Sequence, residues 1–142
     1  MTDGPRCVLD TNVLISAGIA AGTPLRVLFW VILNGRLLAS PETLDEFSSR
    51  FISRTKFDRY VDRPARERFV ASVSGAAELV AVTTRLAVCA DPDDDKLVAL
   101  AVDGRADCVV TGNARDFPAA HGGVPVVTPA QFAGRYLPAP PA

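Results

Sequence analysis

The sequence predicts an α/β fold in which a parallel sheet is covered by helices on both faces. Two observations favour this class. Short runs of apolar residues, typical of buried strands, alternate along the chain with longer segments of helical periodicity. No internal repeat and no linker divides the chain. We therefore expect a three-layer α/β/α sandwich with a central parallel sheet of four or five strands.

The first expected elements are separated by proline and glycine. A β-like run, Arg6–Leu9, ends at Asp10, and a helix-compatible stretch follows over 11–18. A proline opens the second helix, expected over 24–34, and Gly35 stops it. These elements form the first strand–helix–helix unit of the predicted sheet.

The later elements have similar signals. A short strand is expected over 36–39, and Ser40–Pro41 is typical of an N-cap followed by proline at the first helical position. That helix is expected to run to about Ile52. Asp91–Pro92 opens another helix, expected to end at Gly104. The remaining helices are expected over 64–77 and 129–136, and the remaining strands over 78–82, 107–110 and 125–127.

The 142 residues fit one domain, expected over 1–136, followed by a loose Pro/Ala-rich tail over 137–142. The longest apolar run, Val27–Leu33, is shorter than the roughly 20 residues that cross a bilayer. No secretion signal is expected. The three cysteines form no CxxC pair, so a zinc knuckle or disulfide framework is not indicated. We expect a cytoplasmic protein without membrane contact.

Two aspartates lie where a parallel sheet places its ligands. Asp10 directly follows the first strand, and ligands bind beyond the carboxyl ends of such strands, although Asp10 could instead cap the next helix. Asp94 shares a helix face with Leu97, Val98 and Ala101, so its side chain is expected to point inward. A buried carboxylate without a partner is costly, and a metal ion removes that cost.

Other polar residues lie near the same expected edge. Glu46 falls off the apolar face of its helix, where the simplest interpretation is a solvated acid paired with Arg50 at i+4. Thr111, Asn113 and Asp116 follow a later strand and offer oxygens to the same crevice if that strand neighbours the first. The alternative for them is a capped turn.

Carboxylates from distant positions that meet in one place either shift their pKa values or bind a hard cation. Oxygen ligands favour Mg²⁺ or Mn²⁺ over zinc. The single histidine, His121, lies in a glycine-bearing loop. A catalytic triad or a histidine-rich zinc site is therefore not indicated. Hydrolysis of a phosphodiester by metal-activated water needs no histidine base.

Four segments, taken together, resemble the PIN-domain family, in particular the VapC-like toxins of bacterial toxin–antitoxin pairs. The segments are 8–14, 40–47, 91–101 and 110–117. The resemblance implies a PIN-like sandwich with Mg²⁺- or Mn²⁺-dependent endoribonuclease activity. It assigns the metal to Asp10, Glu46 and Asp94, and prefers Asp94 over Asp95.

The resemblance also implies a fourth catalytic acid. Relatives often have Asp where this chain has Asn113, and Asp116 is the residue expected to compensate. The residues expected to support the site are Thr11, Asn12, Thr111 and Asn113.

A basic stretch is expected to hold the RNA. Between Arg50 and Arg68, seven basic residues face three acidic ones, a local charge of +4. Such a stretch beside an acidic crevice suits a single-stranded RNA backbone. The alternative is a solvated helical hairpin with i,i+4 pairs. The residues expected to contact RNA are Arg50, Arg54, Lys56 and Arg59.

Protein partners are also expected. The helix over 25–33 is apolar nearly all round, which is typical of a helix that is buried or lies in an interface. The resemblance implies a homodimer and an antitoxin protein as partners.

Two other functions fit parts of the sequence. In a phosphatase or phosphotransfer domain, Asp10 would be the nucleophile, but Asn12 stands where a DxD motif needs its second Asp. A catalytically impaired PIN-like binding protein would keep the fold and lose the fourth acid. No glycine-rich phosphate loop follows the first strand.

Overall fold

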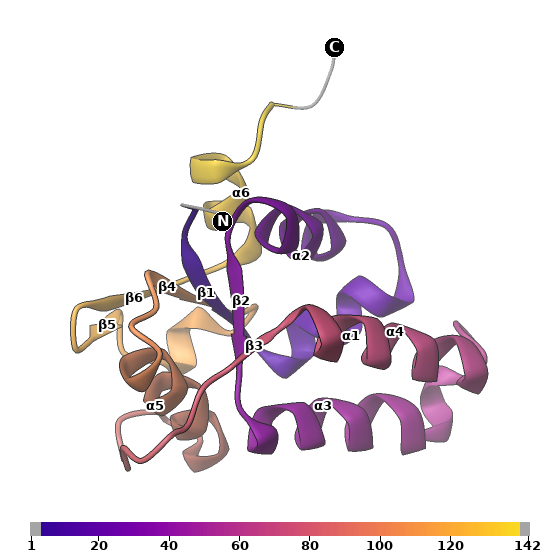
Figure 1. Ribbon diagram of the computed structural model, residues 1–142, viewed down its shortest axis with the longest axis horizontal. Helices are drawn as coiled ribbons and strands as arrows, with labels where there is room; N and C mark the ends of the chain where they lie inside the picture. The colour runs from indigo at the N-terminus through magenta and orange to yellow at the C-terminus, as the bar shows by residue number, and fades with distance from the viewer. Residues whose placement is uncertain (1–3, 140–142) are drawn as a thin grey trace.

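The computed structural model describes residues 4–139 and contains a six-stranded sheet (Figure 1). The strands are β1 (Arg6–Leu9), β2 (Arg36–Ala39), β3 (Glu78–Leu79), β4 (Cys108–Val110), β5 (Ala120–His121) and β6 (Val124–Val127). Their order is β3-β2-β1-β4-β6-β5, and all neighbours pair in parallel except β5 with β6. The expected α/β sandwich with a central parallel sheet is confirmed.

Helices connect the parallel strands. They are α1 (Thr11–Ile19), α2 (Thr23–Asn34), α3 (Pro41–Ser53), α4 (Arg63–Ala76), α5 (Asp95–Asp103) and α6 (Pro129–Tyr136). Three short 3-10 helices are η1 (Thr55–Phe57), η2 (Pro92–Asp94) and η3 (Ala114–Asp116). The predicted start of α3 is confirmed, because the Ser40 side chain accepts a hydrogen bond from the Thr43 backbone N–H and the Thr43 hydroxyl accepts one from the Ser40 backbone N–H.

The helices divide unequally between the two faces of the sheet. Alternate residues of β1 point to opposite faces, so Cys7 and Leu9 join one core and Val8 joins the other. The first core is covered by α1, α2, α3, α4 and α6, and the second by α5. Figure 1 shows α5 on one side of β2 and α1, α3 and α4 on the other.

One expected strand is much shorter than the sequence predicts. β3 pairs with β2 only over Glu78–Leu79, and residues 80–90 then continue as an extended arm over α5. The Asp103 carboxylate accepts hydrogen bonds from the backbone N–H groups of Thr83 and Thr84. Alternate arm residues pack on the second core, so the arm keeps the burial pattern of a strand without a partner strand.

A short hairpin was missed by the sequence analysis. β5 and β6 are joined by Gly122 and Gly123, which both have positive φ, at 57° and 82°. A two-residue turn with two positive φ angles matches the twist of the strands it joins, and glycine adopts it without strain. The expected helix over 91–104 is also divided, into η2 and α5.

The last helix ends where the sequence predicts, and both chain ends extend beyond the described residues. α6 ends at Tyr136, as expected, while residues 1–3 of the expected domain and 140–142 of the expected tail lie outside the described residues. Within residues 4–139, no single helix has the length and hydropathy of a membrane span. α1 and α2 meet those criteria only as a pair, with a bend of 107° between them.

Candidate metal centre

Asp10 and Thr111 form the base of the site at the carboxyl edge of the sheet. They follow β1 and β4, which pair directly with Leu9 opposite Val110. The Thr111 hydroxyl donates to Asp10 Oδ2 at 2.7 Å, and the backbone N–H of Asn12 donates to Oδ1 at 3.4 Å. Asp10 is 5% exposed and Thr111 is fully buried. Asp10 therefore caps α1 and also presents a fixed carboxylate at this edge.

Asp94 lies among other carboxylates at the same edge. Burial, together with the negative charges of Asp10, Asp91, Asp116 and Glu46, raises the pKa of Asp94 to about 6. Asp94 precedes α5, but its side chain makes no capping hydrogen bond there. Three segments far from Asp94 in the sequence thus bring acidic side chains close enough to act on it.

The neighbouring aspartates have structural tasks. The Asp95 carboxylate accepts hydrogen bonds from the backbone N–H groups of Val88 and Cys89, both at 2.9 Å. These bonds hold the pKa of Asp95 below its usual range although burial opposes them. Asp91 caps η2 by accepting from the backbone N–H of Asp93 at 3.0 Å. Asp95 therefore anchors the arm, whereas the Asp94 carboxylate caps no helix and lies with the other acids.

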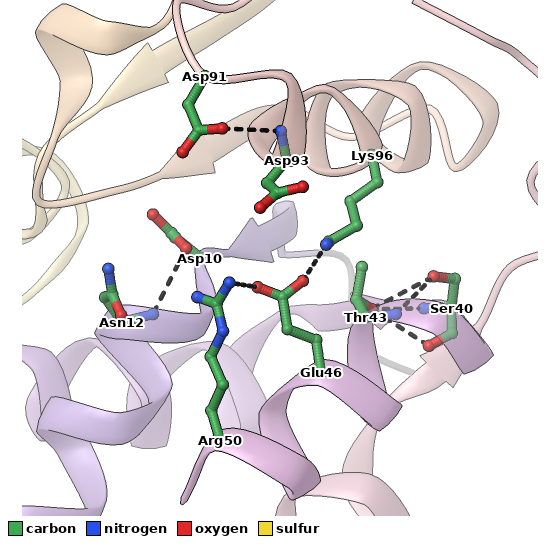
Figure 2. A network of polar contacts seen from close by, with 9 residues as sticks. All are labelled: Asp10, Asn12, Ser40, Thr43, Glu46, Arg50, Asp91, Asp93 and Lys96. Carbon is green, nitrogen blue, oxygen red and sulfur yellow. Dashed lines mark hydrogen bonds and ion pairs between the residues drawn. The ribbon is translucent and has the colours of Figure 1, made fainter.

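Glu46 forms two ion pairs (Figure 2). Its Oε1 lies 2.8 Å from Arg50 on the next turn of α3, the i,i+4 pair expected from the sequence. Its Oε2 pairs with Nζ of Lys96, from α5. The side chain of Glu46 is only 14% exposed, so both pairs lie in a partly desolvated place. The contacts fix Glu46 at the side of the cluster.

The other expected site residues lie at different depths. Asp116 ends η3 and is exposed, with its carboxylate near enough to affect Asp94. Asn113 is exposed, and its backbone N–H donates to the Thr111 hydroxyl at 3.1 Å. Asn12 is exposed, whereas Thr11 is buried and lines a small internal cavity whose lining contains no acidic residue. The backbone of Asn12 and Asn113, rather than their amide groups, contacts the site.

The donor chemistry suits a hard divalent cation. The acceptors here are carboxylate and hydroxyl oxygens, and burial together with neighbouring negative charge raises the pKa of Asp94, two effects that a bound cation would offset. Within the described residues, no three acidic, histidine or cysteine side chains lie close enough together to hold one metal ion. Glu46 is held by Arg50 and Lys96, so its carboxylate would have to exchange one of these cations for a metal.

Lys96 is the functional candidate that the sequence analysis missed. It lies in the first turn of α5, where a positive charge opposes the helix dipole. A lysine at that unfavourable position is a signal that the side chain has another task. In the structure that task is the ion pair with Glu46 across the edge of the sheet.

The expected RNA-binding residues fall into two groups. Arg50 is engaged by Glu46 inside the site. Arg54, Lys56 and Arg59 are exposed on the segment that connects α3 to α4. Arg66, from the same basic stretch, is instead buried and donates to the carbonyl oxygens of Val61 and Ile52.

Comparison with known proteins agrees with this architecture. A family model described as a PIN domain matches residues 6–115, which is most of the chain and includes three of the four acids. Searches of curated proteins and of solved structures found no match. PIN domains are generally nucleases that act on RNA or other nucleic acid, and they typically use divalent metals. The fold, the acid cluster and the extent of this match together show that the chain belongs to the PIN-domain family.

Proposed function

We propose that this protein is an endoribonuclease that uses Mg²⁺ or Mn²⁺. The observation that carries the proposal is the pairing of β1 with β4, which places the buried Asp10 carboxylate and its Thr111 donor at the carboxyl edge of the sheet, near enough to Asp94 for the Asp10 charge to raise the pKa of Asp94. Asp10, Glu46 and Asp94 would hold the metal, and Asp116 would be the fourth acid. A bound divalent cation would supply a water of lowered pKa and would stabilise negative charge on a phosphodiester.

The residues of the chain have distinct tasks in this proposal. The Thr111 hydroxyl and the N–H of Asn12 fix both oxygens of Asp10, so that carboxylate needs little reorganisation to bind a cation. Lys96 and Arg50 hold Glu46 and place positive charge beside the acids. If a metal took the place of Lys96 on Glu46, the ammonium would be available to pair with a phosphate oxygen of the substrate.

The decisive test is cleavage of single-stranded RNA in Mn²⁺. Asp94→Asn is expected to abolish cleavage and to leave the fold intact, because it removes charge without changing shape. Asp45→Asn is a matched control, since Asp45 is exposed on α3 and makes no ion pair within residues 4–139. Unchanged cleavage by Asp94→Asn would refute the assignment of this residue.

A binding protein without catalysis is the second candidate. The observation that favours it is that Glu46 already has two cationic partners, which compete with a metal. Calorimetric titration of the protein with Mn²⁺ separates the two functions. Saturable binding that Asp94→Asn removes supports the nuclease, and lack of binding supports the catalytically impaired protein.

We also propose that the protein is the toxin of a toxin–antitoxin pair and forms a homodimer. The toxin role rests on the resemblance of the motifs to such toxins. The dimer is supported by α2, whose residues Val27, Leu28 and Val31 are buried while Phe29 and Leu33 are 55% and 73% exposed. Slowed growth on expression, relieved by Asp94→Asn, tests the toxin role. Light scattering of Leu33→Glu tests the dimer, and a wild-type monomer contradicts it.

A further inference from the structure

A hollow of about 670 Å³ lies on the surface away from the acid cluster. Its lining residues are Ile19, Lys56, Phe57, Arg59 and Tyr60. Tyr60 is 57% exposed, and the Arg59 guanidinium lies over one face of its ring, 5.2 Å from the ring centre. An exposed aromatic ring with a guanidinium over one face can take a planar, electron-rich group on its other face.

The segment that lines the hollow is fixed by the buried side chain of Arg66. The Arg66 side chain is 2% exposed and donates hydrogen bonds to the carbonyl oxygens of Ile52 and Val61, one on each side of the lining segment. It also forms an ion pair of 2.8 Å with Asp58. Phe57 is buried, edge-on against Phe51 with 5.3 Å between ring centres. The hollow therefore belongs to a packed segment and is largely preformed.

The charge around the hollow is positive. Arg54, Lys56 and Arg59 are exposed and have no carboxylate partner within the described part of the chain. The nearest acid in the sequence, Asp58, is committed to Arg66. An anionic ligand would meet cations that no internal pair neutralises, which favours a phosphate-bearing partner over a basic or neutral one.

Two helices set the distance from the hollow to the acids. α1 and α3 pack side by side; α1 begins next to Asp10 and ends at Ile19, and α3 carries Glu46 and ends next to Arg54. At 1.5 Å per helical residue, each path is about 12–14 Å long. An extended single strand of a few nucleotides spans such a distance.

We infer that this hollow binds one unpaired base of a single-stranded RNA, stacked on Tyr60, while Lys56 and Arg59 contact the flanking phosphates. The inference rests on the proposed nuclease function, which places the cleaved bond at the acid cluster. Bases of a duplex are stacked on each other and cannot use this ring, so the hollow selects single-stranded substrate. Any base can stack on an aromatic ring, so the hollow is expected to accept the base at one position of the strand whatever its identity.

The test measures binding in EDTA, so it does not depend on cleavage. The probes are short single-stranded oligoribonucleotides that carry 2-aminopurine at successive positions, and a duplex of the same sequence. We expect quenching at one position and weak duplex binding. Tyr60→Leu keeps an apolar side chain but not the ring, and is expected to lose the quenching and about tenfold in affinity. Tyr60→Phe keeps both.

A matched pair of arginine variants checks the phosphate contact. Arg59→Gln is expected to weaken binding and its salt dependence. Arg135→Gln removes the same charge from a similar contact, because Arg135 lies 5.2 Å from the Tyr136 ring centre on α6, and it is expected to bind as wild type. In Figure 1, α6 lies far from the segment joining α3 and α4.

The inference is overturned if Tyr60→Leu binds and quenches like the wild type, or if no single position is quenched. Equal affinity for single strand and duplex, or no RNA binding at all, also overturns it. Because these measurements contain no active metal, loss of Mn²⁺-dependent cleavage alone counts against the nuclease proposal and not against the hollow.

Discussion

Lys96 of α5 and Glu46 of α3 form an ion pair that joins the two helical layers across the carboxyl edge of the sheet. The pair stands beside the acid cluster, and Glu46 is shared with Arg50. The same carboxylate is thus a structural partner of two cations and a proposed metal ligand. Four predictions test how this edge and its supports work.

Lys96→Gln is expected to have opposite effects on stability and metal binding. Without metal, it removes a partly buried ion-pair partner of Glu46. The free energy of unfolding is expected to fall by only about 1–2 kcal/mol, because Arg50 still pairs with Glu46. With metal, it removes a competing cation, so Mn²⁺ binds more tightly. Urea unfolding in EDTA and a Mn²⁺ titration measure the two effects. Lys56→Gln, at the other lysine of the chain, is the control, and an equal gain in its Mn²⁺ affinity contradicts the explanation.

The raised pKa of Asp94 predicts a pH-dependent stability in the absence of metal. Below its usual pKa, Asp94 is protonated in both the folded and the unfolded chain, and it has no effect. Between about pH 4 and pH 6, the folded chain holds the proton that the unfolded chain releases, so stability falls as the pH rises. Asp94→Asn is therefore expected to be more stable than wild type at pH 7 in EDTA.

The measurement for Asp94 is the difference in unfolding free energy between wild type and Asp94→Asn across this range. Comparing the two proteins cancels the titration of other groups. The difference is expected to grow up to about pH 6 and then level off. Mn²⁺ is expected to stabilise only the wild type. A difference that does not change with pH would show that Asp94 titrates normally.

Thr111→Val is expected to weaken both activity and stability. Valine has a similar shape but cannot donate to the buried Asp10 carboxylate, and a lost hydrogen bond to a charged group costs about 1.5–3 kcal/mol. RNA cleavage and Mn²⁺ affinity are expected to fall, since Asp10 loses its fixed orientation. Thr111→Ser retains the hydroxyl and is expected to restore both. Equal behaviour of the valine and serine variants would exclude a role for the hydroxyl.

Arg66→Met is expected to destabilise the protein by about 2–4 kcal/mol in urea unfolding. It leaves the carbonyls of Ile52 and Val61 and the Asp58 carboxylate without their donor. Arg63→Met, at an exposed arginine of the same helix with a longer 3.8 Å pair, is the control and is expected to change stability little. Equal losses would show that burial of Arg66 has no special effect.

The sequence predicted the parts of the site that depend on local pattern. Apolar runs that end in polar residues located the carboxyl edge, and the spacing of Asp94 to Leu97 and Val98 distinguished it from Asp95. Both inferences need only the periodicity of one element. The adjacency of β1 and β4, which brings Thr111 to Asp10, could be stated only as a condition, because strand order is a long-range property.

The rest could not be read from local pattern. The arm over 80–90 alternates like a strand, but its N–H groups at Thr83 and Thr84 bond to the Asp103 side chain, which no periodicity reveals. Lys96 reaches Glu46 only because α3 and α5 meet at the same edge. The Gly122–Gly123 turn did carry a hairpin signal, but β5 is too short for any pattern of its own.

The run from Asp91 to Lys96 assigns a different task to nearly every residue. Asp91 caps η2, Asp94 joins the acids, Asp95 anchors the arm and Lys96 reaches Glu46. Inserting or deleting one residue would rotate the side chains on one side of the change by about 100° around the helix axis. Each of these side chains would then lose its present partner. In relatives that share this edge, the run is therefore expected to align without gaps, while the length of the arm before it is free to vary.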